Sequence, residues 1–234
     1  MVPQALLLSR DADVLRLMRR LLDDTFVRAQ VSYSPLQATA DLKRHKFDAV
    51  IVDCEDLDRA GEFLHSLRRT SSSRRAIAVA MLGRPHSLST AFRMGANFGL
   101  DKPLCLEHAV RCLRAARGLI LRECRRYHRH PVQLPVSLRA AAGASLTTQS
   151  ANFSEDGMAV ETGGRVPIGS VVKVRFLLPG SASMVEANGQ VTWEGRHGLA
   201  GIHFQQMLES SRLRYRGWLD QRLVGQFTSA PYQA

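Results

Sequence analysis

The hydrophobic pattern of this chain changes at an arginine-rich segment just past its middle, residues 119–133. Before this segment, short apolar runs alternate with stretches in which apolar residues recur at helical spacing. After it, apolar and polar residues alternate in short runs that are separated by glycine-containing turns. The two patterns predict two folded domains, at residues 3–118 and 134–226, with the arginine-rich segment as linker and arm between them.

The first domain is predicted to be a doubly wound α/β fold. Its apolar runs at residues 5–9, 47–53 and 76–82 are typical of parallel strands that are buried on both faces. Residues 14–22 repeat apolar side chains at helical spacing, and the last helix of the domain is expected to end or loosen at Gly118. Strands and helices that alternate in this way form a parallel sheet with right-handed crossovers.

The second domain is predicted to be a small antiparallel β-barrel. Alternating runs predict strands at residues 136–139, 158–162, 172–176, 185–193 and 199–204. Glycine-containing turns separate these runs, as is typical of small barrels. Residues 210–224, which include Trp218 and Leu219, are predicted to form an amphipathic helix that closes the barrel.

Charge and cysteine content narrow the functional classes. The chain of 234 residues has a formal net charge of +11, which favours anionic partners such as nucleotides, nucleic acid or anionic lipid. Its four cysteines form no CxxC pair, so a zinc site has little support and a reducing compartment is expected. No apolar run reaches the roughly 18 residues that span a bilayer, and the first residues lack the pattern of a signal peptide. We therefore expect a cytoplasmic protein without membrane contact.

Residues at the expected ends of strands indicate a more specific type of fold for the first domain. Asp53 ends the central apolar run, and Lys102 precedes a proline before the last predicted helix. Together with the pair Gly95-Ala96, this arrangement resembles the receiver domains of response regulators over residues 3–118. The resemblance implies that Asp53 is the phosphoryl acceptor and that Lys102 contacts the phosphoryl group.

Two departures from the receiver pattern predict a degenerate domain. Receivers carry two acidic residues after the first strand, where they hold magnesium, but this chain has Ser9 and Arg10 there. The switch hydroxyl after the fourth strand is replaced by Met81 or Leu82. We expect a pseudo-receiver that serves as a dimerisation or docking module, in which Arg10 could pair with Asp53 in place of the metal.

Two short motifs in and before the second domain indicate the protein family that it resembles. Arg125-x-x-x-Arg129 is followed by Asn152-x-Ser154-x-x-Gly157 at the start of a predicted strand. In this order the motifs resemble the PilZ family over residues 122–224. The resemblance implies binding of the second messenger cyclic di-GMP, often as an intercalated ligand dimer. Whether the protein itself forms a homodimer stays open.

The chemistry of the motifs fits this ligand. Cyclic di-GMP has two phosphates and two guanines, and a guanidinium group binds phosphate bidentately and hydrogen-bonds to guanine. The resemblance implies that the arginines grip guanine and phosphate, that the Asn and Ser side chains contact the other side of the ligand, and that the glycine keeps the approach open. The predicted ligand-binding residues are Arg125, Arg126, Arg129, Asn152, Ser154 and Gly157.

The remaining motifs point away from catalysis and metal binding. His128 and His130 could suggest a metal pair, but the sequence places no third ligand beside them, so we predict no metal site. The chain shows no nucleophile elbow, P-loop or HExxH motif, and we predict that it is not an enzyme.

We therefore expect a cyclic di-GMP effector. Ligand binding would order the arm at residues 125–129 and change its arrangement against the pseudo-receiver, which alters a surface offered to a downstream protein. Two alternatives stay open. One is a protein-interaction scaffold whose site does not bind ligand. The other is a nucleic-acid-binding protein, which the net charge favours but the low aromatic content of 6% does not.

Overall fold

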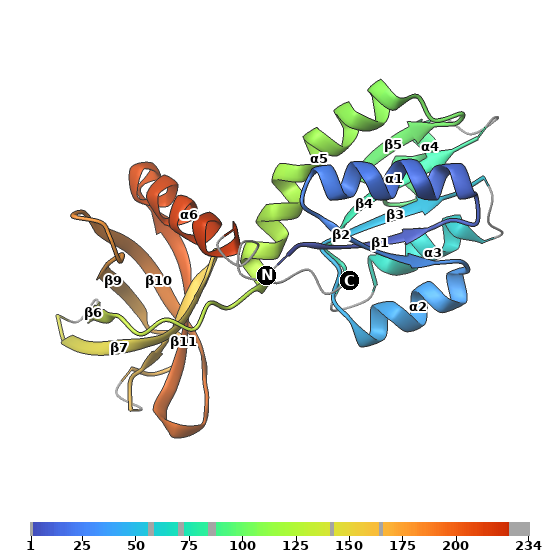
Figure 1. Cartoon of the computed structure of the whole chain (residues 1–234). Coiled ribbons are helices and arrows are strands. Elements are labelled where there is room, and N and C mark those ends of the chain that lie inside the picture. The colour runs from blue at the N-terminus through green and yellow to red at the C-terminus, as the bar shows by residue number, and fades with distance from the viewer. Residues whose placement is uncertain are drawn as a thin grey trace, which may run out of the picture. The chain divides into compact units, whose positions relative to one another are not determined.

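The computed structural model describes residues 2–55, 59–69, 73–83, 88–140, 143–163 and 166–224. The chain divides into two compact units, one from Val2 to Cys124 and one that begins at Arg125 (Figure 1). Each unit has its own hydrophobic core, and each is described by itself. Among the described helices, none combines the length and apolar character that crossing a bilayer requires.

The first unit is a five-stranded parallel sheet with strand order β2-β1-β3-β4-β5. This is a doubly wound order, so the predicted α/β fold is confirmed. Its elements are β1 (Gln4–Leu8), α1 (Ala12–Asp24), β2 (Arg28–Ser32), α2 (Pro35–Arg44), β3 (Ala49–Asp53), α3 (Ala60–Leu67), β4 (Ile77–Leu82), α4 (Leu88–Arg93), β5 (Phe98–Asp101) and α5 (Leu106–Tyr127).

Helices cover both faces of this sheet and bury its central strands. Helices α1 and α5 pack on one face, and α2, α3 and α4 pack on the other (Figure 1). Every residue of β3 and of β4 is buried as a result. Polar side chains at the carboxyl ends of β1 and β3 therefore come together at one edge of a rigid sheet, which is where ligands bind in such folds.

Helix α5 continues through Gly118 as far as Tyr127, so the expected end at this glycine was wrong. Residues 119–127, which were predicted as linker, therefore belong to this helix, and burial of its apolar stripe explains why. The buried stripe of the helix includes Ala116, Ile120 and Cys124 and thus extends past the glycine. Burial of one large apolar side chain contributes about 1.5–3 kcal/mol, which exceeds the helix cost of glycine at about 1 kcal/mol.

The second unit is a closed barrel of six strands in the order β10-β11-β8-β7-β6-β9, with antiparallel pairing throughout. The predicted small antiparallel barrel is thus confirmed, with its final helix. The elements are β6 (Pro135–Ala140), β7 (Ser145–Ser154), β8 (Gly157–Glu161), β9 (Val171–Leu177), β10 (Met184–Glu194), the short 3-10 helix η1 (Arg196–Gly198), β11 (Leu199–Met207) and α6 (Glu209–Val224).

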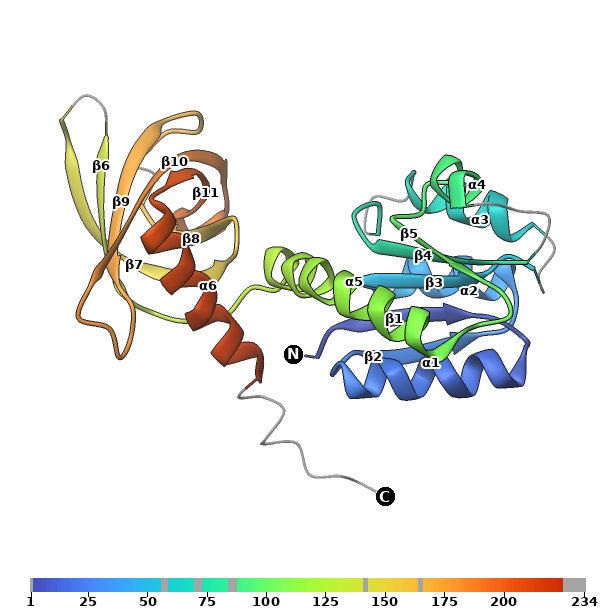
Figure 2. The ribbon, with the colours of Figure 1, turned by 90° about the horizontal axis from the view of Figure 1, so that it is seen from above.

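Aromatic side chains join α6 to the interior of the barrel. Tyr215 of α6 is completely buried, and its ring lies 5.9 Å from that of Phe176 in β9. Trp218 and Phe153 have ring centroids 5.7 Å apart. Figure 2 shows α6 against the barrel strands. Trp218 and Leu219 are buried in the barrel core. Tyr215, which the sequence did not single out, is the largest fully buried side chain among the residues that the structure describes.

Candidate ligand-binding site

The arginine arm and the Asn152–Gly157 segment lie side by side in the second unit. Beyond the end of α5, the backbone of His130 pairs with Phe153 through hydrogen bonds of 2.7 and 2.9 Å. Ser154 ends β7 and pairs with Gly157 at the start of β8, which leaves a two-residue turn. The NH of that turn's first residue, Glu155, donates to the carbonyl O of Arg125 at 3.0 Å. This bond satisfies one of the carbonyls that the last turn of a helix leaves without a partner.

Arg125 is buried and already paired with two carboxylates. Its Nε donates to Oε2 of Glu155 and its Nη1 to Oδ1 of Asp220 in α6, both at 2.7 Å. Burial by itself would lower the pKa of Arg125, but the hydrogen bond to Glu155 and the charges of both carboxylates raise the pKa instead. Its guanidinium is therefore a fixed cation inside the protein, with 10% of the side chain exposed.

The other two arginines of the arm lie closer to solvent. Nε of Arg126 contacts Oδ2 of Asp156 at 2.5 Å, with both side chains partly exposed. Arg129 is exposed, and its Nη1 lies 3.3 Å from Oδ1 of Asn152. Residues from both motifs thus meet at the surface, and Arg129 presents the most accessible guanidinium of the arm.

Ser154 and Gly157 shape the turn from inside. Oγ of Ser154 donates to the carbonyl O of Gly157 at 3.3 Å, and the carbonyl O of Ser154 accepts from the hydroxyl of Tyr215 at 2.7 Å. A Cβ added to Gly157 would lie 2.2 Å from the carbonyl O of Ile202 in β11. The close approach that requires this glycine is therefore made by a neighbouring strand.

Four charged residues of the site were missed by sequence reasoning, and one of them is Asp156, the partner of Arg126. Glu155 uses its second oxygen, Oε1, to contact Nη2 of Arg216 in α6 at 3.2 Å. Asp220 reaches Arg125 from the same helix. Glu155 lies within the second motif and could have been considered, but no local pattern links Asp220 to an arginine 95 positions earlier.

His130 brings a polar atom into the interior beside the arm. The residue is 3% exposed, and its Nε2 has no hydrogen-bond partner among the described residues. The His128 ring stands edge-on at 4.4 Å. Burial, together with the neighbouring charges of His128 and Arg222, lowers the pKa of His130 to about 4. The imidazole is therefore neutral near pH 7.

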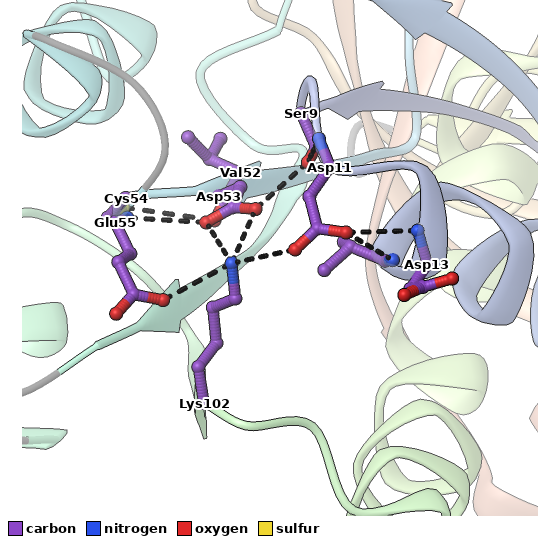
Figure 3. A network of polar contacts seen from close by, with 9 residues as sticks. Ser9, Asp11, Asp13, Val52, Asp53, Cys54, Glu55 and Lys102 are labelled. Atoms are coloured by element: carbon purple, nitrogen blue, oxygen red, sulfur yellow. Dashed lines mark hydrogen bonds and ion pairs between the residues drawn. The ribbon is translucent and has the colours of Figure 1, made fainter.

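A second polar network lies at the strand edge of the first unit (Figure 3). The fully buried Asp53 accepts hydrogen bonds from Oγ of Ser9 at 2.9 Å and from Nζ of Lys102 at 3.1 Å. Nζ of Lys102 also contacts Asp11 at 3.3 Å and Glu55 at 3.2 Å. Burial opposes the charge on Lys102, but the carboxylates around it raise its pKa above the ordinary value.

The residues at this edge do not fit a magnesium ion. Oδ1 of Asp11 caps α1 by accepting from the NH groups of Asp13 and Val14, and its Oδ2 contacts the Lys102 ammonium. Ser9 supplies a hydroxyl where a carboxylate ligand would be needed, and magnesium binds oxygen ligands in a nearly ideal octahedron. The described residues contain no group of three His, Cys, Asp or Glu side chains arranged to hold a metal ion.

Arg10 was expected to pair with Asp53, but the contacts described for these two residues involve other groups. Nε of Arg10 donates to the carbonyl O of Tyr33 at 3.0 Å, and the ammonium that contacts Asp53 belongs to Lys102. The neighbouring Cys54 is held as a thiol, because burial and then the charge of Asp53 raise its pKa to about 12.

The comparisons with known proteins separate along the same division of the chain. A family model described as PilZ domain matches residues 123–221. No curated protein matches the chain. Solved structures resemble the first part. The chemotaxis response regulator CheY4 of Vibrio cholerae is 18% identical over 49% of this chain and 98% of that chain, with a TM-score of 0.45. The receiver domain of sensor histidine kinase PA1611 from Pseudomonas aeruginosa is 20% identical over 50% of this chain and 99% of that chain, with a TM-score of 0.44.

Proposed function

Residues 123–221 form a PilZ domain, a member of a family of cyclic di-GMP-binding effector domains, and we propose that this chain is itself a cyclic di-GMP effector. The observation that carries the proposal is the meeting of the two motifs, because Arg129 of the arm lies 3.3 Å from Asn152 at the surface of the barrel. A phosphate or guanine edge placed there would meet a guanidinium and an amide, which together offer donors and an acceptor.

The proposed role of each site residue follows from its exposure to solvent. Arg129 and Arg126 would bind the phosphate and guanine groups first, since they are the accessible arginines of the arm. Asn152 would contact the other side of the ligand. Ser154 and Gly157 would act by holding the turn in shape, and Arg125 would reach the ligand after a rearrangement of its ion pairs.

The proposed output is a change in the arm. Ligand binding would order residues 125–129 in a new arrangement against the pseudo-receiver, and a downstream protein would recognise the changed surface. The pseudo-receiver would serve as a docking or dimerisation module without phosphoryl transfer. The support for this part is the fixed Lys102 cation beside Asp53 and the Ser9 hydroxyl in place of a carboxylate.

Titration with cyclic di-GMP by calorimetry tests the proposal. Wild-type protein should bind at micromolar concentration or tighter, and Arg129→Ala should lose about 2 kcal/mol or more, roughly a 30-fold weakening. Arg139→Ala is the matched control, because Arg139 is an exposed arginine of β6 whose loss should leave the affinity unchanged within about twofold. Absence of binding heat for wild-type protein at high micromolar ligand would refute the effector function.

One observation favours the alternative of a scaffold with a non-binding site. The first arginine of the motif is buried and satisfied by Glu155 and Asp220, so its charge is neutralised without a ligand. The same titration decides between the two functions. A parallel titration with duplex DNA at two salt concentrations addresses nucleic-acid binding, which would show a strong salt dependence.

A further inference from the structure

The carboxylates around Arg125 already accept hydrogen bonds from the guanidinium nitrogens that an anionic ligand would need. Glu155 and Asp220 take hydrogen bonds from two different nitrogens of its guanidinium, and 10% of the Arg125 side chain is exposed. A phosphate can bind Arg125 only if at least one carboxylate moves away. Hydrogen bonds between charged groups are about twice as strong as neutral ones, so this exchange affects ligand affinity directly.

The two carboxylates differ in how easily they can release Arg125. The Asp220 side chain is 45% exposed and can turn into water. The Glu155 side chain is 5% exposed and would be left as a buried charge, which is strongly unfavourable without a partner. Glu155 does have a second partner, since its other oxygen lies 3.2 Å from Nη2 of Arg216.

Arg216 has unused capacity for this exchange. Its Nε is buried and has no hydrogen-bond partner among the described residues. A small movement of Glu155 toward α6 would give that Nε an acceptor and would keep the Glu155 charge paired. The energetic obstacle to freeing Arg125 is therefore reduced by an arginine on a different element.

We propose that Glu155 and Asp220 form an internal latch on Arg125, that cyclic di-GMP competes with this latch, and that Arg216 takes over Glu155 when Arg125 turns to the ligand. The proposal rests on the proposed cyclic di-GMP binding and concerns its regulation. In the latched state Asp220 ties α6 to the arm, and in the bound state this tie is broken. Helix α6 is then the element whose docking on the barrel sets ligand affinity.

The first test is Asp220→Asn, which removes the charge and keeps the side chain's shape. Weakening the latch should tighten cyclic di-GMP binding about tenfold, because losing one competing ion pair should change the affinity by about a factor of ten. Gln221→Ala, an exposed neighbour on the same helix, is the control and should bind as wild type does. Far-UV circular dichroism confirms that each variant is folded.

The second test separates an action of Arg216 through Glu155 from direct contact with ligand. Arg216→Ala should weaken binding about tenfold, because Glu155 then loses its alternative partner. In the double variant Glu155→Gln/Arg216→Ala this loss should disappear relative to Glu155→Gln alone, since a neutral side chain needs no ionic partner. A loss of the same size in the Glu155→Gln background would overturn the takeover by Arg216.

The outcomes distinguish the latch from the effector function. If wild type binds and Asp220→Asn binds no tighter, the latch is wrong and the effector function stands. If only Asp220→Asn binds, the latch is supported and the native chain is not an effector under those conditions. If neither protein binds cyclic di-GMP, both proposals fail. Hydrogen exchange adds a direct readout, because ligand should increase exchange in the C-terminal turns of α6.

Discussion

At the scale of single residues, His130 predicts a specific pH dependence of stability. Its pKa is about 4 in the folded protein and 6.5 as the ordinary value, so the unfolded chain binds more protons between these limits. The free energy of unfolding therefore rises with pH across this window and is lost as pH falls through it. A shift of this size corresponds to about 3 kcal/mol. Urea unfolding followed by tryptophan fluorescence measures it in the second unit, which contains both tryptophans.

His130→Val removes the titrating group and isolates this effect from other acid-sensitive residues. The variant should lose part of the slope of stability against pH between about pH 4 and 6.5. His128, whose pKa is also lowered, first by burial, keeps its own contribution in both proteins. An unchanged slope in the variant would show that His130 carries a proton or a partner in the folded state.

The sequence identified the motif arginines but not how they are used. Arg125 and Arg129 look equivalent in the pattern, yet one is 8% exposed and the other lies at the surface. Arg125 pairs with the buried Glu155 and with Asp220 of α6, and these contacts exist only in the tertiary fold. Ser154 shows the same limit, since its Oγ donates to Gly157 within the turn and its carbonyl O accepts from Tyr215 of α6. Local patterns cannot report such long-range contacts.

At the scale of elements, Gly118 offers a test of why α5 is long. An added Cβ would meet nothing within 4 Å, and the residue lies in a helix without positive φ. Gly118→Ala should therefore stabilise the first unit by about 1 kcal/mol and raise its melting temperature by a few degrees. Gly143→Ala is the opposing control, because its φ of +88° is strained for alanine although its surroundings are equally open. Thermal unfolding followed by circular dichroism should show opposite signs for the two variants.

Strands were predicted where their residues are apolar, and the more polar strands β2 and β7 were missed. β3 and β4 are buried at every position, so their composition alone reveals them. β2 and β7 have mostly polar residues, and their places are fixed by pairing with neighbouring strands. The sequence places the motif at the start of a strand, and Gly157 does begin β8, but Asn152 and Ser154 lie at the end of the preceding strand β7. Strand pairing is non-local and leaves little trace in a polar sequence.

At the scale of the whole molecule, two separate cores predict two independent responses. The apolar clusters of the first unit contain no residue beyond Ile120, and the barrel cluster contains none before Val132, among the residues that the structure describes. In the sequence, the periodic patterns on either side of the arginine-rich segment predict two domains. Because each core is closed within its unit, a ligand or substitution in one unit should change the stability of that unit foremost.

Scanning calorimetry with selective perturbations tests this independence. Cyclic di-GMP at about 100 times its Kd should stabilise the barrel unit by about 2.7 kcal/mol and raise its transition temperature alone. Lys102→Met should lower the other transition, because it takes the ammonium away from the buried Asp53 charge, at a cost of about 3 kcal/mol or more. Incubation with a small phosphodonor and magnesium should change neither transition nor the protein's mass.

The experiments with the phosphodonor and with cyclic di-GMP also decide which unit receives the signal. If the phosphodonor adds a phosphoryl group to Asp53 and shifts the first transition, Lys102 is a mobile partner and the α/β unit is a working receiver. If cyclic di-GMP shifts both transitions, the arm transmits the free energy of binding into the first unit. A shift of the barrel transition alone, with no phosphoryl group added to Asp53, would assign ligand sensing to the barrel. The pseudo-receiver would then act by its surface, because the buried Asp53 carboxylate is already neutralised by the Lys102 ammonium.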